Sequence, residues 1–476
     1  MPSTTSSIAA SDRIPLLQKI MFSAGGTMDY VATGLSTSVL WMPYFNIGLG
    51  IDTALLGLIL MILRGWDAFV DPVMGNFSDN ARTRWGRRRP FMAVGAVLTA
   101  AIFPFIWRVP TGVGETEQAL YLIVIGMIFF TCFSSWSMPY FGLQLELTPN
   151  YDERTRLTGW MTFCGKFTGL MGGWVLAVLT TSHWFANPAT GKSDIVYAIR
   201  TCSWFIAGFI LIAGLLPPIF VKERYYETET KHQAKDPFLQ SIWESMHCGP
   251  LWLLIGISFF LVLGSAFSGV LGQYMNIYFV NQGKLSNAFM IAGWASSAMF
   301  VTGILTIPFW IWMGERFDKK ILVAVLLTGS MLGHLLNFFC LRPDAPYLQL
   351  IPAVFSSMAV SAVWLFLPSM KADVADYDEM TTSRRREGAL NAFYSWFIKA
   401  ATTCAAGAGG IAIHLSGFSA TRVEQPPEVL YRMKILYLAL PFILWSVTLI
   451  FIRYYPLNRQ RMAKIRQELE VRRGKM

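Results

Sequence analysis

Apolar runs of about 20 residues, the length that lets an α-helix cross the hydrocarbon core of a membrane, recur along the whole sequence. We count twelve such runs in the 476 residues, separated by short polar breaks. Only 14% of the residues are charged, against roughly 25% in an average soluble domain. The sequence therefore predicts an all-α polytopic membrane protein. The predicted spans are 21–47, 53–77, 91–107, 119–147, 157–182, 197–221, 250–281, 288–314, 321–341, 349–370, 388–416 and 432–453.

Positive charges are distributed unevenly between the polar breaks. With the first 19 residues placed in the cytoplasm, 28 of the 39 Lys and Arg residues fall on that side, 8 on the other side and 3 within the spans. This asymmetry orients membrane proteins, so we expect both termini in the cytoplasm. It also explains the formal net charge of +10 without nucleic-acid binding. The polar first 19 residues lack the features of a cleaved signal peptide.

A charged stretch at 222–248 divides the spans six and six, and short motifs recur on both sides of it. Y-D-E occurs at 151–153 and again at 377–379, and R-W-G-R-R-R-P (84–90) corresponds to E-R-F-D-K-K (315–320). Two parallel repeats of this kind are typical of the major facilitator fold. We expect an N-terminal six-helix bundle (1–221), a connecting loop (222–248), a C-terminal six-helix bundle (249–454) and a basic cytoplasmic tail (455–476), which is solvated or lies on anionic lipid.

Two aspartates interrupt the second apolar span, in R-G-W-D-A-F-V-D-P-V-M-G (64–75). An ionised carboxylate at the centre of a bilayer helix costs about 2.5 to 3.5 kcal/mol. In a helix, Arg64, Asp67 and Asp71 project from one face, because they are spaced by three and four residues. The second span therefore presents one charged stripe to the bundle interior.

The stripe has two interpretations. Arg64 could neutralise an aspartate in a structural ion pair. However, two carboxylates one turn apart repel each other when both are ionised, so Asp67 and Asp71 need a shared proton or a bound cation. Oxygen ligands suit a hard cation such as Na⁺, and a carboxylate can instead take up H⁺. We predict a cation site here, with Asp67 and Asp71 as metal ligands only if the ion is Na⁺.

Other polar and aromatic side chains within the spans suit a sugar. Asp29 lies among small residues, where a carboxylate can accept hydrogen bonds from two sugar hydroxyls, although pairing with Lys166 or Lys399 is the alternative. Lys399 is expected to pair with an aspartate. The rings of Tyr394, Trp396 and Trp364 could stack on a sugar, although aromatic residues in membrane helices more often pack in the core.

The polar breaks around the two Y-D-E motifs mix acidic and basic residues. Some of these charges are expected to be merely solvated. Because the pattern occurs in both halves, we predict that others form ionic contacts that close the inner side in one state and release it in another. The predicted gate residues are Asp152, Glu153, Arg154, Arg156, Asp373, Asp376 and Arg386.

The sequence offers no enzyme site. The five histidines are scattered, and a G-x-x-x-x-x-G-K segment at 159–166 has the wrong spacing for a phosphate-binding loop. The six cysteines show no C-x-x-C spacing and are expected to be buried as small apolar residues.

The motifs W-D-A-F-V-D-P-V-M-G (66–75) and N-A-R-T-R-W-G-R-R-R-P (80–90) closely resemble the second helix and following loop of the glycoside-pentoside-hexuronide:cation symporters. The resemblance includes M-P-Y (138–140), D-E-R-T-R (152–156), A-D-V-A-D-Y-D-E (372–379) and R-Y-Y-P-L-N (453–458), and spans nearly the whole chain. It implies that Asp67 and Asp71 bind the cation and that Asp29 is the principal sugar-binding carboxylate. The full set of substrate-binding residues is then Asp29, Arg64, Ser134, Ser137, Tyr140, Trp364, Tyr394 and Lys399.

The chain departs from the pattern of that family at the sugar site. A fourth-helix aspartate is replaced by Ser137, a fifth-helix arginine by Cys164, and a lysine before Asp29 by Met28. The nearest base, Lys166, lies about 200° around the helix from Cys164. We expect that the cation machinery is retained and that the sugar pocket is rebuilt. The loss of the fourth-helix carboxylate slightly favours H⁺ over Na⁺.

These observations predict a symporter that imports a sugar or glycoside with Na⁺ or H⁺ by alternating access, in the inner membrane of a bacterium. It is expected to act as a monomer within the lipid bilayer, without a cofactor and without nucleic acid. The alternatives are a cation-coupled lysolipid symporter of the same superfamily and an uncoupled sugar facilitator. A membrane enzyme or a sensor is disfavoured.

Overall fold

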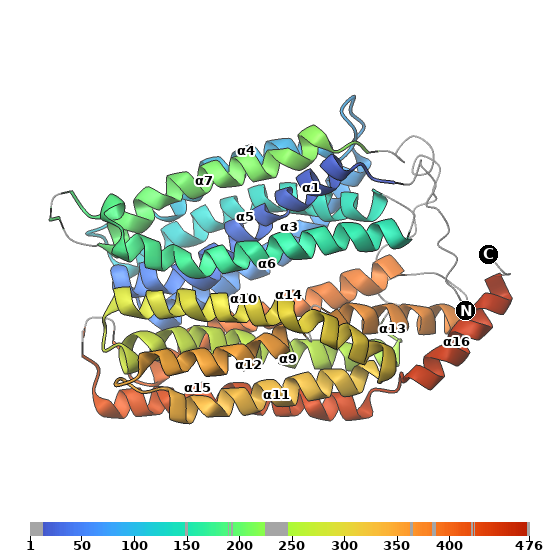
Figure 1. Ribbon diagram of the computed structural model, residues 1–476. Coiled ribbons are helices and arrows are strands. Elements are labelled where there is room, and N and C mark those ends of the chain that lie inside the picture. Colours follow the sequence, from blue (N-terminus) through green and yellow to red (C-terminus); the bar gives the residue numbers. More distant parts are fainter. Residues whose placement is uncertain are drawn as a thin grey trace. The chain divides into compact units, whose positions relative to one another are not determined.

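The computed structural model describes the chain from Arg13 to Arg473 with internal gaps (Figure 1). The residues outside the description are 1–12, 148–150, 189, 192–193, 224–245, 362–364, 383–386, 420–421, 423 and 474–476. Within the described residues the secondary structure consists of helices, and no β-strand occurs. The chain forms two compact units, of which the first comprises Met1–Ile51 and Ile62–Ala234 and the second comprises Asp52–Met61 and Lys235–Met476.

The first unit contains the helices that carry the aspartates singled out in the sequence. They are α1 (Leu16–Gly25), α2 (Thr27–Asp29), the π-helices η1 (Tyr30–Leu40) and η2 (Pro43–Gly48), α3 (Thr53–Asn80) from Ile62 onward, α4 (Arg89–Ile106), α5 (Glu115–Glu146), α6 (Tyr151–Thr181), the short 3-10 helix η3 (His183–Phe185) and α7 (Ile195–Phe220).

The second unit contains the first residues of α3 and the remaining described helices. These are α9 (Gly249–Tyr274), the π-helix η5 (Met275–Val280), α10 (Leu285–Arg316), α11 (Lys319–Cys340), the 3-10 helix η6 (Pro346–Gln349), α12 (Leu350–Ser361), α13 (Leu367–Thr382), α14 (Glu387–Leu415), α15 (Pro427–Tyr454) and α16 (Arg459–Arg473).

Among the residues that the structure describes, ten helical segments are long and apolar enough to span a membrane. They correspond to ten of the twelve predicted spans, with ends that agree within six residues. The other two predicted spans, 21–47 and 349–370, coincide with helix that is broken into shorter pieces. The first runs through α1, α2, η1 and η2, and the second through α12 and the start of α13. The wider π-helical turns of η1 directly follow Asp29, and such irregular turns are frequent at functional sites.

In the first unit, α4 packs against both α5 and α7. Gly95 allows the close approach of α4 and α5, because a Cβ at this position would lie 2.7 Å from the backbone nitrogen of Trp136. The indole nitrogen of Trp136 donates a hydrogen bond of 2.9 Å to the carbonyl of Gly214 on α7. These contacts fix the rotation of α5, which carries Ser134 on the adjacent turn.

In the second unit, α9 packs against α14 and α15, and α11 packs against α12 and α15. The apolar side of α16 belongs to the same core, since Met462, Ile465 and Leu469 are buried in it and α16 packs against α13. The sequence predicted a tail that is solvated or lies on lipid. Instead, its apolar side chains are covered by protein, and the exposed side carries Arg461 and Lys464.

The first residues of α3 group with the second unit because glycines let them pack closely on α14. A Cβ on Gly410 would lie 2.2 Å from the carbonyl oxygen of Thr53, and one on Gly57 would lie 2.8 Å from that of Gly407. Just before α3, Asp52 accepts hydrogen bonds from the backbone of Ala54 and Leu55, which caps the helix. Its other carboxylate oxygen lies 2.8 Å from Nδ1 of His414.

We predict that Gly95→Ala lowers the midpoint of thermal unfolding of the detergent-solubilised protein. The added methyl group would meet the backbone of α5 rather than a side chain that can move, and overpacking of this kind typically costs about 1 to 3 kcal/mol. Gly208→Ala on α7 is the matched control, because nothing lies within 4 Å of the added Cβ. An equal decrease in the unfolding midpoint of both variants would show that the α4–α5 contact at Gly95 tolerates a methyl group as well as the open site at Gly208 does.

Candidate functional site

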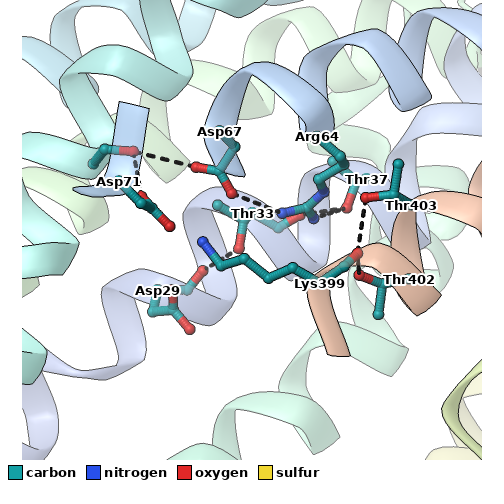
Figure 2. Close-up of polar contacts among 10 residues, drawn as sticks. Asp29, Thr33, Thr37, Arg64, Asp67, Asp71, Lys399, Thr402 and Thr403 are labelled. Carbon is teal, nitrogen blue, oxygen red and sulfur yellow. Dashed lines mark hydrogen bonds and ion pairs between the residues drawn. The ribbon is translucent and has the colours of Figure 1, made fainter. Parts of the chain in front are cut away.

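The charged stripe predicted for the second span is present on α3 (Figure 2). Asp67 and Asp71 are 2% and 7% exposed, respectively, so the stripe faces the protein interior. The helix continues past Pro72, whose missing N–H removes one backbone hydrogen bond within α3. Two carboxylates are thus held one helical turn apart in a region that is shielded from water.

Ser134 on α5 brings the two carboxylates together. Its Oγ lies 3.2 Å from Oδ1 of Asp67 and 2.8 Å from Oδ1 of Asp71. A serine hydroxyl carries one hydrogen, so it can donate to only one of the two carboxylates at a time. The two acidic groups therefore share a single donor here, and a cation between them would relieve their mutual repulsion.

Arg64 lies to one side of the aspartate pair. One terminal nitrogen of its guanidinium is 3.9 Å from Oδ2 of Asp67, and the other donates a hydrogen bond of 3.0 Å to Oγ1 of Thr37 on η1. The guanidinium carbon lies 5.2 Å from the centre of the Phe130 ring on α5. The structural ion pair considered from the sequence is therefore present, although it is long. The contact with Thr37 links the stripe to the π-helix that follows Asp29.

The register of α3 against α5 is set by Trp66. Its indole nitrogen lies 3.0 Å from Oγ1 of Thr131 and 3.2 Å from the carbonyl oxygen of Met127. One turn earlier, Leu63 packs into the space left by Gly126. The sequence did not single out these residues, because their function appears only when the two helices are side by side.

Asp29 ends α2 and is partly exposed within the first unit. The hydroxyl of Thr33 donates a hydrogen bond of 2.8 Å to its backbone carbonyl (Figure 2). The following residue, Tyr30, has its ring against Gly34 and its hydroxyl against Gly172 of α6, where a side chain would collide with it. Gly34 and Gly172 therefore make room for the side chain of Tyr30, next to Asp29 in the chain.

Ser137 and Tyr140 on α5 lie in the packed interior of the first unit. Ser137 is 1% exposed. Tyr140 is fully buried, its hydroxyl donates a hydrogen bond of 3.0 Å to the carbonyl of Phe22, and its ring stacks on Trp136. The hydroxyl of Tyr140 is thus already engaged in a hydrogen bond within the core.

The remaining predicted substrate residues belong to the second unit. Tyr394 is 9% exposed and donates a hydrogen bond of 2.6 Å to Ser258. Lys399 is partly exposed, and its backbone carbonyl accepts hydrogen bonds from Thr402 and Thr403 (Figure 2). Trp364 lies outside the described residues.

Three of the predicted gate residues, Glu153, Arg156 and Asp373, form ion pairs within their own units. Glu153 at the start of α6 is bound by Lys19 of α1 at 2.6 Å and by Arg156 at 3.3 Å. Asp373 on α13 is bound by Lys319 at the start of α11, also at 2.6 Å. The sequence did not identify either lysine, because each partner is remote in the chain.

Asp376 lies on α13 and is partly exposed. The side chains of Asp152 and Arg154 and the whole of Arg386 lie outside the described residues.

The pKa of Glu153 reflects its partners. Burial raises this pKa, but the hydrogen bond and positive charge of Lys19 outweigh burial, and the net result is a pKa below the ordinary value of 4.5. Glu153 is therefore an ionised partner at neutral pH, and it ties α6 to α1.

Glu223, after α7, anchors the basic break between α3 and α4. Its carboxylate accepts backbone hydrogen bonds of 3.1, 2.9 and 3.0 Å from Arg87, Arg88 and Arg89, respectively. These N–H groups form the start of α4, where a negative charge is favourable. Gly86 has a φ of 103° and a Cβ there would lie 2.6 Å from the same carboxylate, so this turn requires glycine. Glu223 carries no motif that would have singled it out in the sequence.

Metal-binding clusters of three or more His, Cys, Asp or Glu residues are not found in the described part of the chain. The six cysteines are free thiols, and only Cys248 and Cys340 are buried as the sequence suggested for all six. Cys404 is exposed and the other three are intermediate.

The chain matches the family described as MFS/sugar transport protein over residues 22–459, and it therefore belongs to this family of the major facilitator superfamily. It is 25% identical to an uncharacterised symporter of Synechocystis, over 97% of this chain and 98% of that protein. It is 22% identical to the sodium-dependent lysophosphatidylcholine symporter 1 of Gallus gallus (96% and 90% covered) and to a glucuronide carrier protein homolog of Escherichia coli (95% and 94% covered).

Solved structures of transporters share the fold. The nucleoside transporter NupG aligns with a TM-score of 0.62 at 13% identity, covering 92% of this chain and all of that one. The D-xylose-proton symporter aligns with a TM-score of 0.60 at 14% identity, covering 92% and 97%. The predicted major facilitator fold is confirmed, and ten of the twelve predicted spans correspond to helices of membrane-spanning length in the described residues. The protein is a multi-pass membrane transporter.

We predict that Lys19→Met and Glu153→Gln each destabilise the protein and that the double variant is less destabilised than the sum of the two. The coupling energy should be about 1 to 3 kcal/mol, because both partners are shielded, with 11% of the Lys19 side chain and 1% of the Glu153 side chain exposed. The pKa of Glu153 is lowered by folding, so its contribution is present above pH 4.5 and is lost as the pH falls through the lowered pKa.

The measurement is the unfolding midpoint in detergent between pH 7 and pH 4. Wild type should lose more stability over this range than the double variant, in which residue 153 no longer titrates. Identical pH profiles would contradict a stabilising pair.

Proposed function

We propose that this transporter is a symporter that carries a sugar or glycoside into the cell together with Na⁺ or H⁺. The proposal is carried by one observation, the buried pair of Asp67 and Asp71 joined through Ser134. Charged groups are costly within a membrane protein and are commonly part of an ion pathway. A pair of carboxylates around one hydroxyl supplies oxygen ligands to Na⁺ and an acceptor to H⁺.

The position of Arg64 supports the proposal that a cation binds to the aspartate pair and dissociates from it again. Its 3.9 Å separation from Asp67 leaves only a weak ion pair, and its shorter contact is with a neutral hydroxyl of Thr37. A strong, short pair would neutralise the carboxylate permanently and would compete with the travelling ion. The long separation between Arg64 and Asp67 is instead compatible with a cation that binds and leaves the aspartate pair.

Coupling follows from the charge of the ion. One positive charge moving inward is worth about 2.3 kcal/mol per 100 mV of membrane potential. If the loaded cation site favours the substrate-binding state, the substrate must favour cation binding by the same factor. Alternating access then converts this reciprocal binding into accumulation of the substrate inside the cell. The protein would lie in the inner membrane of a bacterium, with both termini in the cytoplasm.

A lysolipid is the second candidate substrate, because several similar proteins are named lysophosphatidylcholine symporters. Sequence identity does not separate this candidate from the sugar, since the glucuronide carrier homolog is also 22% identical. The two named substrates have one chemical property in common, which is an acidic group: the carboxylate of a glucuronide and the phosphate of a lysophosphatidylcholine.

We predict that Ser134→Ala weakens cation dependence and that Asp67→Asn and Asp71→Asn abolish ion-driven accumulation. Loss of the bridging hydroxyl should raise the half-saturating cation concentration by about tenfold, the effect of one hydrogen bond to a charged group. Ser135→Ala is the matched control, because Ser135 donates instead to the carbonyl of Thr131. Equal effects of the two serine variants would contradict a cation site at the aspartate pair.

The function itself is tested by counterflow in proteoliposomes, with a panel of labelled sugars, glycosides and lysophosphatidylcholine. Each is measured with and without Na⁺ at fixed pH, and with and without a pH gradient at fixed Na⁺. We expect uptake of one sugar or glycoside that rises with one of the two ions. Uptake that depends on neither gradient would identify an uncoupled facilitator. Uptake of the lysolipid alone would show that the substrate is a lysolipid and not a sugar.

A further inference from the structure

Lys371, on α13 of the second unit, holds an ammonium group among polar and aromatic side chains. Its Nζ donates a hydrogen bond to Oδ1 of Asn391 and lies 5.3 Å from the centre of the Tyr394 ring, both on α14. Lys371 and Asn391 are partly exposed. The sequence analysis did not assign Lys371 any function.

The acidic residue nearest to Lys371 in sequence is already engaged on the other side of the helix. Asp373 is bound by Lys319 at 2.6 Å. Residues two apart in a helix point about 200° away from each other, so Asp373 faces α11 while Lys371 faces α14. Throughout the described part of the chain, no carboxylate oxygen lies within 4.0 Å of the Lys371 ammonium.

The surroundings of Lys371 are rigid. The Tyr394 hydroxyl donates a hydrogen bond of 2.6 Å to Ser258 on α9, which is fully buried. On the same side of α14, Phe393 packs edge-on against Trp252 of α9 at 5.4 Å. Since α9, α13 and α14 pack against one another, the tyrosine ring and the asparagine amide hold the lysine in one place.

An ammonium has three N–H donors, and Asn391 accepts only one. The face of Tyr394 offers a further electrostatic contact without neutralising the charge. The arrangement fixes a positive charge and leaves donors for a ligand. A positive charge built in this way, with a neutral amide and a ring in place of an acid, is complementary to an anion.

We propose that Lys371, held by Asn391 and Tyr394, binds the acidic group of the transported substrate, a carboxylate or a phosphate. This inference rests on the proposed function and narrows it, because it selects acidic substrates such as a sugar acid or a lysophospholipid over neutral sugars. A purely structural lysine that ties α13 to α14 would affect neutral and acidic substrates alike.

The test uses pairs of probes that differ in the acidic group. The first pair is p-nitrophenyl glucuronide and p-nitrophenyl glucoside, and the second is oleoyl lysophosphatidic acid and monooleoylglycerol, which differ in the phosphate alone. Uptake by the full chain in proteoliposomes gives KM and maximal rate for each, and the unfolding midpoint in detergent reports folding. Wild type should prefer the acidic member of one pair. That pair shows whether the acidic group bound by Lys371 is a carboxylate or a phosphate.

Three variants separate binding from structure. Lys371→Met should raise KM for the acidic probe by about tenfold, as expected for one charged hydrogen bond, while KM for its neutral partner changes by less than about twofold. Lys371→Arg should retain the preference. Asn391→Asp places a carboxylate beside the Lys371 ammonium, so the contact between α13 and α14 should become stronger. The preference for the acidic probe should still be lost, because the positive charge of Lys371 is then neutralised.

The outcomes separate the two proposals. Wild type that takes up a neutral probe but not its acidic partner overturns the anion site and leaves the transporter proposal standing. An unchanged preference in Asn391→Asp, or equal losses for both members of a pair in Lys371→Met, also overturns it. Wild type that takes up neither member of either pair overturns both proposals.

Discussion

The central constraint on this molecule is the placement of two carboxylates, one helical turn apart, in the interior of a membrane protein. Asp67 and Asp71 are nearly inaccessible to water, and they share the single hydroxyl hydrogen of Ser134. Two ionised carboxylates this close repel each other, and a proton or a cation bound between them would relieve the repulsion. The rest of the first unit can be understood as the scaffold that keeps this pair together, because α5 must present Ser134 to α3 at hydrogen-bonding distance.

That scaffold depends on close backbone contacts rather than on large apolar side chains alone. Gly95 lets α4 approach α5, Gly126 receives Leu63, and Trp66 fixes the register of α3 through Thr131. In membranes, helices associate through such packing and through hydrogen bonds between helices, since apolar surface is equally well accommodated by lipid. Arg64 then adds a positive charge close enough to bias Asp67 but too distant to neutralise it fully.

Ion pairs within each unit bind the ends of helices together. Lys19 and Glu153 join α1 to α6 in the first unit, and Lys319 and Asp373 join α11 to α13 in the second. Glu153 belongs to the first Y-D-E motif, and Asp373 lies four residues before the second. Lys371 differs from these lysines, because its neighbours are an amide and an aromatic ring and not a carboxylate.

The sequence alone determined the helical membrane fold and the charged stripe on α3, because hydrophobic length and helical spacing are local properties. It could not determine which residues on other helices meet the stripe. Trp66, Lys19, Lys319, Glu223 and Lys371 therefore had no assigned function, and the hydrogen bond from the Tyr140 hydroxyl to the carbonyl of Phe22 was not foreseen. The tail was likewise expected to be solvated or lipid-bound, whereas α16 packs on α13. These contacts join residues far apart in the chain, and only tertiary packing decides how helices are rotated and which polar groups come within bonding distance.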